Sequence, residues 1–170
     1  MKKWLPITAW MLAGWFLTSC SISYKFNQSS IDYTKVSNIS IKDFPNMANL
    51  VYTPLSQKFT EALKDKYTRQ TKLRVIREGG DLDLEGEITG YDFTPLAVSA
   101  DMYAAQTRLT ITIRVRFTNN AEPDKDFERS FSAKSEFENS KSIPEVEDDL
   151  CEVIIKEIID LIFNETVATW

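Results

Sequence analysis

The sequence contains no histidine, and only two of its 170 residues are cysteines. Without histidine the chain cannot build a Ser-His or Cys-His nucleophile, and it lacks the commonest zinc ligand. It also lacks the motifs of a phosphate-binding loop, a hydrolase nucleophile, an EF-hand and a CxxC redox centre. We therefore expect a protein that is not an enzyme and that uses neither a metal nor a cofactor.

Positive charge is also scarce, because 20 basic residues stand against 25 acidic ones and give a net charge of −5. Nucleic-acid binding depends on neutralising phosphates, so this balance argues against a nucleic-acid partner. A hydrophobic content of 43% and a charged content of 26% are ordinary for a globular chain. The length fits one domain with a substantial core.

The first twenty residues have the features of a secretory signal. Lys2 and Lys3 precede an almost uncharged stretch from Trp4 to Leu17, which is too short to indicate a membrane-spanning helix. The end of this stretch, Leu17-Thr18-Ser19-Cys20, resembles a bacterial lipobox. The resemblance implies cleavage before Cys20 and lipidation of that cysteine. An ordinary signal peptide or an uncleaved anchor are the alternatives.

The chain then divides into a signal peptide over residues 1–19, a lipidated polar tether over 20–34 and one α+β domain over 35–170. If Cys20 is acylated, the remaining Cys151 has no partner for an intramolecular disulfide. The domain must then be held together by packing alone.

Two segments have the periodicity of amphipathic helices. Thr53-Pro54 indicates a helix start, and an apolar residue at every fourth position predicts a helix over about 53–69. The capping box Ser142-Ile143-Pro144-Glu145 predicts a second helix that ends near Phe163. We expect its buried side to include these residues: Val146, Leu150, Val153, Ile154, Ile158, Leu161 and Ile162.

Alternating apolar residues indicate strands over 36–44, 81–93, 107–118 and 127–137, and a short strand over 72–77 is also expected. Residues 107–118 alternate without a fault, which means that one face is buried and the other is wet. The main order is strand-helix-strand-strand-strand-helix. It predicts an α+β, two-layer sandwich with two helices on one face of a four-stranded, mostly antiparallel sheet. The other face should be polar and bare.

Charged residues are expected in rows on that bare face. Acidic positions 81, 83, 85 and 87 would lie beside Arg108, Arg114 and Arg116. The simpler interpretation is a ladder of cross-strand ion pairs. The functional alternative is that these three arginines, together with Lys134, bind a phosphorylated ligand, because the guanidinium group can hold phosphate in a bidentate manner.

The connection over residues 94–106 is unusually apolar for a link between strands. It includes Leu96, Val98, Met102 and Tyr103. A contiguous exposed apolar patch often marks an interaction site, so we expect these residues to contact a partner.

Several segments together resemble the LptE family of lipopolysaccharide-assembly lipoproteins, and in particular its Bacteroidetes-type branch. They are residues 54–63 (PLSQKFTEAL), 86–91 (GEITGY), 108–113 (RLTITI) and 115–117 (VRF), in addition to the lipobox. The resemblance implies a lipid-anchored protein on the periplasmic side of the outer membrane. It further implies that the protein plugs the LptD barrel and helps to deliver lipopolysaccharide.

The resemblance also bears on location, since no acidic run follows Cys20 and such runs resemble surface-export signals in that bacterial group. The alternative function is a lipoprotein subunit of an ABC-type phospholipid-transport system. That alternative predicts an apolar cavity between the helices and the sheet.

Overall fold

The computed structural model describes residues 31–50, 52–96 and 105–168, so Cys20 and its flanks lie outside the described residues. Ile31, within the segment expected to be the tether, is already buried against the domain. No helix in the described part of the chain is both long and apolar enough to cross a membrane.

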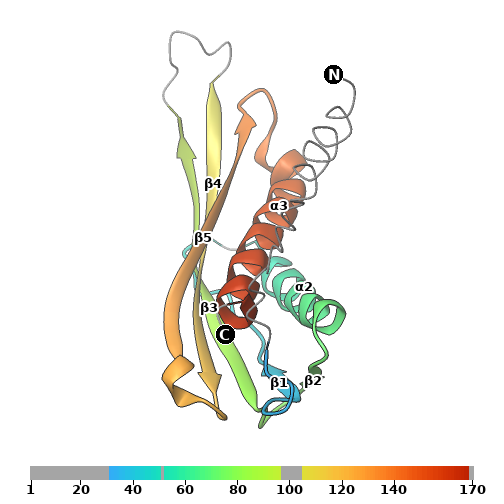
Figure 1. The fold of residues 1–170 in the computed structure, drawn as a ribbon. Coiled ribbons are helices and arrows are strands. Elements are labelled where there is room, and N and C mark those ends of the chain that lie inside the picture. Colours follow the sequence, from blue (N-terminus) through green and yellow to red (C-terminus); the bar gives the residue numbers. More distant parts are fainter. Residues whose placement is uncertain (1–30, 51, 97–104, 169–170) are drawn as a thin grey trace, which may run out of the picture.

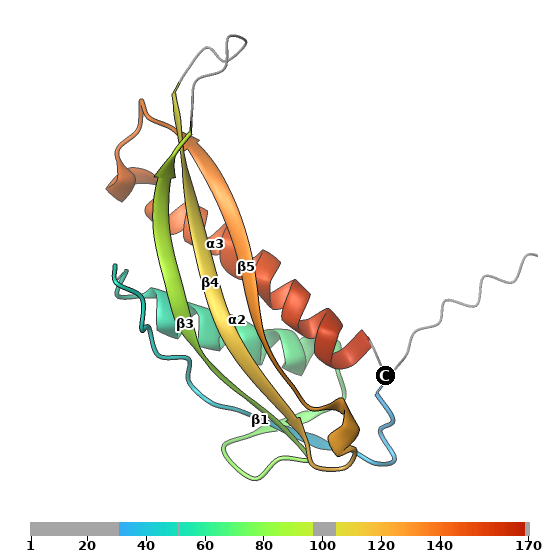
Figure 2. The same cartoon turned by 90° about the vertical axis from the view of Figure 1, so that its left-hand side faces the viewer.

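Five strands form a single sheet in the order β2-β1-β3-β4-β5. They are β1 (Asn38–Ile41), β2 (Arg74–Ile76), β3 (Leu82–Pro95), β4 (Gln106–Asn119) and β5 (Phe127–Glu138). The long strands β3, β4 and β5 form an antiparallel meander, as predicted. Helices α2 (Leu55–Gln70) and α3 (Ile143–Phe163) lie on one side of the sheet, and the other face is bare (Figure 1, Figure 2).

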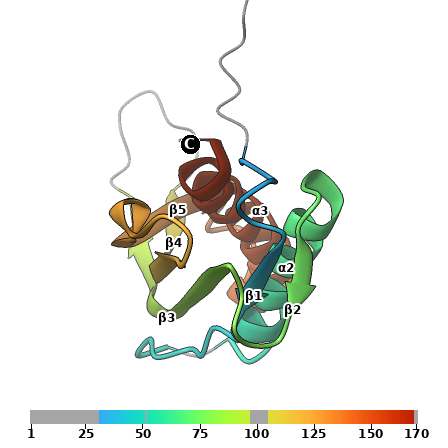
Figure 3. The same cartoon turned by 60° about the horizontal axis from the view of Figure 1, so that its bottom comes forward.

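The predicted four-stranded, mostly antiparallel sheet is wrong in two respects. The sheet has five strands, and it is mixed, because β1 pairs in parallel with both β2 and β3. Helix α2 accounts for the β1–β2 pair, since it returns the chain to the end of the sheet from which β1 started, and a strand that follows such a crossover runs parallel to the first. The short loop after β2 then brings β3 to the other side of β1, again in parallel. Figure 3 shows β1 between β2 and β3 at this end of the molecule.

The helices begin and end near their predicted positions. The capping box is present at α3, where the Ser142 N–H donates to the Glu145 carboxylate at 2.8 Å. Thr53 does not cap α2, whose N-cap position is Pro54 without a side-chain cap. Val153 and Leu161 were expected to be buried but are 56% and 42% exposed, because the apolar surface of α3 is wider than the part that the sheet and α2 cover.

A β-bulge explains how β3 keeps one apolar face along its length. Leu82, Leu84 and Ile88 are buried, and the register with β4 then shifts between Ile88 and Gly90. Beyond this extra residue, Tyr91 takes the buried side instead of the even-numbered positions. The core therefore continues towards the free end of the hairpin.

Gly86 lies where β3 passes beneath Phe44, which is fully buried and packs edge-on against Phe59 with ring centroids 5.1 Å apart. A Cβ at Gly86 would lie 2.5 Å from Phe44 Cε1 and would also collide with the Arg114 carbonyl oxygen. The absence of a side chain at this position thus makes room for the phenyl ring on the sheet.

We expect Gly86→Ala to lower the free energy of unfolding by about 1–3 kcal/mol, because one of the two colliding groups is backbone and cannot rotate away. Gly90→Ala in the same strand is the matched control. Its Cβ would meet only side-chain atoms of Thr112 and Asp92, at 3.1 Å or more, so its effect should stay within about 1 kcal/mol. Chemical denaturation of both variants measures the difference, and equal effects would contradict this account of Phe44 packing.

Candidate functional site

The bare face of the sheet carries the charged side chains that were predicted from the sequence to lie on it. On β4, Leu109, Ile111, Ile113, Val115 and Phe117 face the helices and are buried. Arg108, Arg114 and Arg116 alternate with them and therefore point to the opposite face. We call this surface, formed by the outward side chains of β3, β4 and β5 and by Lys42, the charged face.

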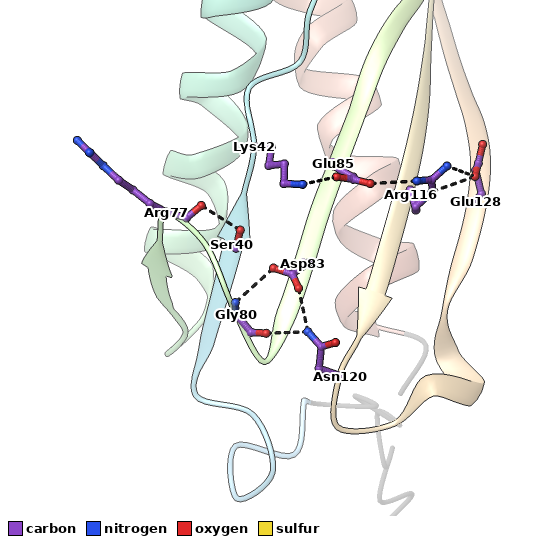
Figure 4. A network of polar contacts seen from close by, with 9 residues as sticks. All are labelled: Ser40, Lys42, Arg77, Gly80, Asp83, Glu85, Arg116, Asn120 and Glu128. Atoms are coloured by element: carbon purple, nitrogen blue, oxygen red, sulfur yellow. Dashed lines mark hydrogen bonds and ion pairs between the residues drawn. The ribbon is translucent and has the colours of Figure 1, made fainter.

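Arg116 lies at the centre of a network of ion pairs on the charged face (Figure 4). Its guanidinium group donates to Glu85 Oε1 on β3 at 3.1 Å, and through Nε and Nη2 to Glu128 Oε2 on β5 at 3.0 Å. Glu85 in turn accepts from Lys42 Nζ at 2.6 Å. One arginine thus joins carboxylates from both neighbouring strands.

These contacts hold the carboxylate of Glu85 in its charged form. The hydrogen bond from Lys42, followed by the positive charges of Lys42 and Arg116, lowers the pKa of Glu85 below its ordinary value of 4.5. Hydrogen bonding to Glu128 and the charges of Glu128 and Glu85 raise the pKa of Arg116. Such a carboxylate does not retain a proton near neutral pH and cannot serve as a general acid there.

The other arginines are paired in the same manner. Arg114 donates to Glu87 on β3, and Arg108 donates to Glu136 on β5 through Nε at 2.9 Å and Nη2 at 2.6 Å. The ladder of cross-strand pairs is therefore present. Glu128 and Glu136 were not foreseen as partners, because only the register of β4 with β5 places them opposite Arg116 and Arg108.

Lys134 lies on β5 opposite Thr110, on the same face as the arginines. Its side chain is exposed and has no ion-pair or hydrogen-bond partner in the described part of the chain. The structure thus brings the four predicted ligand-binding residues to one face, with three of them already engaged by carboxylates and one free.

A shallow cavity of about 410 Å³ lies over the Arg116 network. Three cations and four carboxylates line it together with one glycine: Lys42, Arg114, Arg116, Asp43, Glu85, Glu87, Glu128 and Gly86. An anionic ligand would have to displace a carboxylate to reach an arginine. Among the described residues no group of acidic or cysteine side chains is arranged to hold a metal ion.

A second polar cluster closes the end of the sheet below this network. Asn120 Nδ2 donates to the Gly80 carbonyl and to Asp83 Oδ2, both at 2.8 Å, and Ser40 Oγ donates to the Arg77 carbonyl at 3.2 Å (Figure 4). The Gly80 N–H also donates to Asp83 at 3.3 Å. These bonds tie the loop between β2 and β3 to β1 and to the end of β4, so their role is structural.

Cys151 lies far from this face, in the interior of the molecule. Tyr91 Oη donates to Glu147 Oε1 at 2.6 Å and lies 3.7 Å from Cys151 Sγ. Burial raises the pKa of the Cys151 thiol to about 11, so it stays protonated and unreactive.

Of the predicted partner-contact residues, only Leu96 is described. Its side chain is half-buried, and its N–H donates to the Gln106 carbonyl at 2.9 Å, which extends the β3–β4 ladder. Val98, Met102 and Tyr103 lie outside the described residues.

With the fold and the charged face in view, comparison with known proteins decides the family. The LptE family profile, described as lipopolysaccharide-assembly, matches residues 36–166, which include all five strands and both helices. The chain belongs to the LptE family. The resemblance noted from the sequence is confirmed, while its Bacteroidetes-type branch stays a prediction.

Solved structures share the fold at low sequence identity. An uncharacterized lipoprotein B from Nitrosomonas europaea is 14% identical, with a TM-score of 0.52, and the match covers 78% of this chain and 83% of that one. A hypothetical protein from Chlamydia trachomatis is 11% identical, with a TM-score of 0.51, and the match covers 76% and 97%. No sequence among the curated proteins matches the chain.

The Lys42–Glu85 contact makes the stability of this LptE-family protein depend on pH. Because the pKa of Glu85 is lower in the folded state, its contribution is complete above about pH 4.5 and is lost as the pH falls through the folded-state pKa. Lys42→Met should therefore lower the free energy of unfolding at pH 7, and the two stability curves should converge as the pH falls below 4.5 and Glu85 becomes protonated.

Denaturant titrations across this pH range measure the effect. Lys156→Met is the matched control, since Lys156 is an exposed lysine on α3 without an ion pair among the described residues, and its curve should run parallel to that of the unmodified chain. A constant offset for Lys42→Met at every pH would contradict the role given to Glu85.

Proposed function

We propose that this LptE-family chain is a lipoprotein of the outer membrane that faces the periplasm, plugs an LptD-type barrel and assists lipopolysaccharide assembly. The observation that carries the proposal is the family match over residues 36–166. The lipobox-like Leu17-Thr18-Ser19-Cys20 supports a lipid anchor at Cys20, cleavage of residues 1–19 and a tether over 20–34.

The charged face suits the role of a plug. Barrel interiors are polar, and a surface inserted into one must present hydrogen-bonding and charged groups without exposing an apolar sheet. Here the register of β3, β4 and β5 sets the positions of these groups, which pair across the strands. The meander thus offers a barrel a surface whose charges of both signs are already arranged.

The chemistry of the described residues supports a binding protein rather than an enzyme. The chain has no histidine, its buried thiol is protonated, and the carboxylates over the cavity are engaged by cations. The space between helices and sheet is filled by fully buried side chains such as Phe44, Phe59 and Ile113. This packing offers no support for the phospholipid-transport alternative.

Lipopolysaccharide is the proposed ligand of Arg108, Arg114, Arg116 and Lys134. The free ammonium group of Lys134 can meet an anionic group directly, whereas each arginine must exchange its carboxylate for a phosphate. Such an exchange is reasonable on an exposed face, because surface ion pairs contribute little and are readily replaced. Arg108 and Arg116 each direct two N–H groups at one carboxylate oxygen, and the same planar guanidinium group can hold two oxygens of a phosphate.

This exchange predicts that replacing the basic residues and replacing the acidic residues of the ladder change the affinity for lipopolysaccharide in opposite directions. Lys134→Gln and Arg114→Gln should weaken the binding of purified lipopolysaccharide severalfold, whereas Glu87→Gln should strengthen it, because it frees Arg114. Lys156→Gln on α3 is the control for a general loss of positive charge. Titration with a fluorescent lipopolysaccharide measures the affinities, and weakening by Glu87→Gln would argue that the ladder matters only for structure.

Partnership with a barrel predicts that the native protein is recovered from outer membranes together with a large β-barrel. Replacing Leu96, Val98 and Tyr103 with serine should reduce the recovered barrel while leaving the melting temperature unchanged, because these residues belong to the proposed partner contact. Detergent extraction and affinity purification give the first readout, and thermal denaturation gives the second. Recovery without a barrel would contradict the proposed function, and an equal loss of stability would assign the three residues to the core.

A further inference from the structure

Positive charge is concentrated in one short part of this acidic chain. Residues 71–80, between α2 and β3, contain Lys72, Arg74 and Arg77 against a single acidic residue, Glu78. Strand β2 is an end strand of the sheet, so this segment forms a border of the molecule (Figure 3). We call Lys72, Arg74 and Arg77 the basic edge.

The cations of the basic edge are available to a partner. Arg74 and Arg77 are exposed, and neither side chain has an ion pair or a hydrogen bond among the described residues. Figure 4 shows Arg77 extending away from the polar network around it. Lys72 Nζ lies 5.7 Å from the centroid of the Tyr33 ring, a contact that leaves its charge uncompensated. By contrast, all three lysines of α2 are paired with aspartates.

A depression of about 620 Å³ adjoins the basic edge where β2 ends beside β1 and α2. Arg77, Lys42, Lys64 and the carboxylate of Asp43 line it, and so do three apolar side chains. These are Ile41, Val75 and Ile76. Lys42 and Lys64 are paired with Glu85 and Asp43, so Arg77 is the unpaired cation of this lining. A free cation beside apolar residues matches the boundary between phosphate headgroups and acyl chains, where amphipathic surfaces bind membranes.

The basic edge also lies close to the start of the described chain. Tyr33 contacts Lys72 through its ring, and its hydroxyl oxygen accepts a hydrogen bond from the Lys72 N–H at 3.4 Å. Eleven residue steps separate Cys20 from Ile31, and a chain of that length spans at most about 40 Å. A lipid on Cys20 would therefore hold the basic edge within reach of its own membrane.

The opposite border of the sheet has the opposite charge. Helix α3 packs against β5 and carries seven acidic residues against one basic residue. An anionic surface would repel α3 and attract the basic edge, which gives the domain one favoured orientation. The net negative charge of the chain does not prevent this, because attraction to a membrane is set by the residues within about 10 Å of it at moderate salt.

We propose that the basic edge docks on the phosphate headgroups of the anionic phospholipid leaflet that holds the lipid of Cys20, and so sets the orientation of the domain. The inference rests on the anchor in the proposed function but not on the barrel. Basic residues near an anionic surface each strengthen binding by about fivefold. The tether makes the encounter intramolecular, so a weak contact of this kind is populated.

The test uses the full chain, purified from membranes with its lipidation confirmed by mass spectrometry, and reconstituted into phosphatidylcholine vesicles with or without phosphatidylglycerol. A fluorophore is placed on Gln70→Cys beside the basic edge, or on Ser130→Cys on β5 as the comparison position. Both residues are exposed, and Cys151 is buried and does not compete for the label. Quenching by a nitroxide on the lipid headgroup reports the distance of each probe from the membrane.

We expect the probe at position 70 to be quenched more than the probe at 130, only with phosphatidylglycerol present, and less at high salt. Arg74→Gln together with Arg77→Gln should lower the docked-to-undocked ratio by about 25-fold. The control pair Lys141→Gln and Lys156→Gln removes the same charge elsewhere and should change little. Equal quenching at both positions, no dependence on phosphatidylglycerol, or an equal loss in the control pair would each overturn the proposal. None of these outcomes bears on recovery of a barrel.

Discussion

The two-residue period of the long antiparallel strands is the constraint on which the molecule depends. From Leu109 to Phe117 on β4 every second side chain is apolar and enters the core, and the intervening ones carry charge or hydroxyl groups. A slip of one residue would bury Arg114 and Arg116 and expose the whole apolar row. The same alternation therefore fixes which face the helices cover and which face stays bare.

The charged face adds a second level of register control. Arg116 reaches carboxylates on β3 and β5 at once, and Arg114 and Arg108 reach one neighbour each. Exposed pairs of this kind contribute little to stability, but like charges directly opposite one another are unfavourable, so the ladder penalises wrong pairings. The charges of an exposed face can in this way also specify the pairing of the strands beneath it.

Helices and strands could be predicted from the sequence where the periodic pattern was long, and not where it was short. The alternation of β4, the capping box of α3 and the stripe of α2 each extend over many residues, and each gave the right element. Strands of three and four residues hold too little periodicity to show that β1 lies between β2 and β3 in parallel. Likewise, the apolar character of Val153 and Leu161 says nothing about whether another element covers them. The sequence predicted that the arginines lie together on one face of the sheet. Their partners on β5 depend on the register between β4 and β5, which the sequence of neither strand alone determines.

The position of β1 has a consequence for how the chain acquires its structure. β2 and β3 are joined by a loop of a few residues, yet they do not pair, because β1, a strand from the N-terminal end of the domain, lies between them. The meander can form from neighbouring sequence alone, but the sheet is completed only when residues 38–41 are inserted between two segments made later in synthesis. Such non-local pairing is slow. Until it occurs, β3 keeps an open edge along Leu82–Leu84, which is a place where nascent copies of the chain could join to one another.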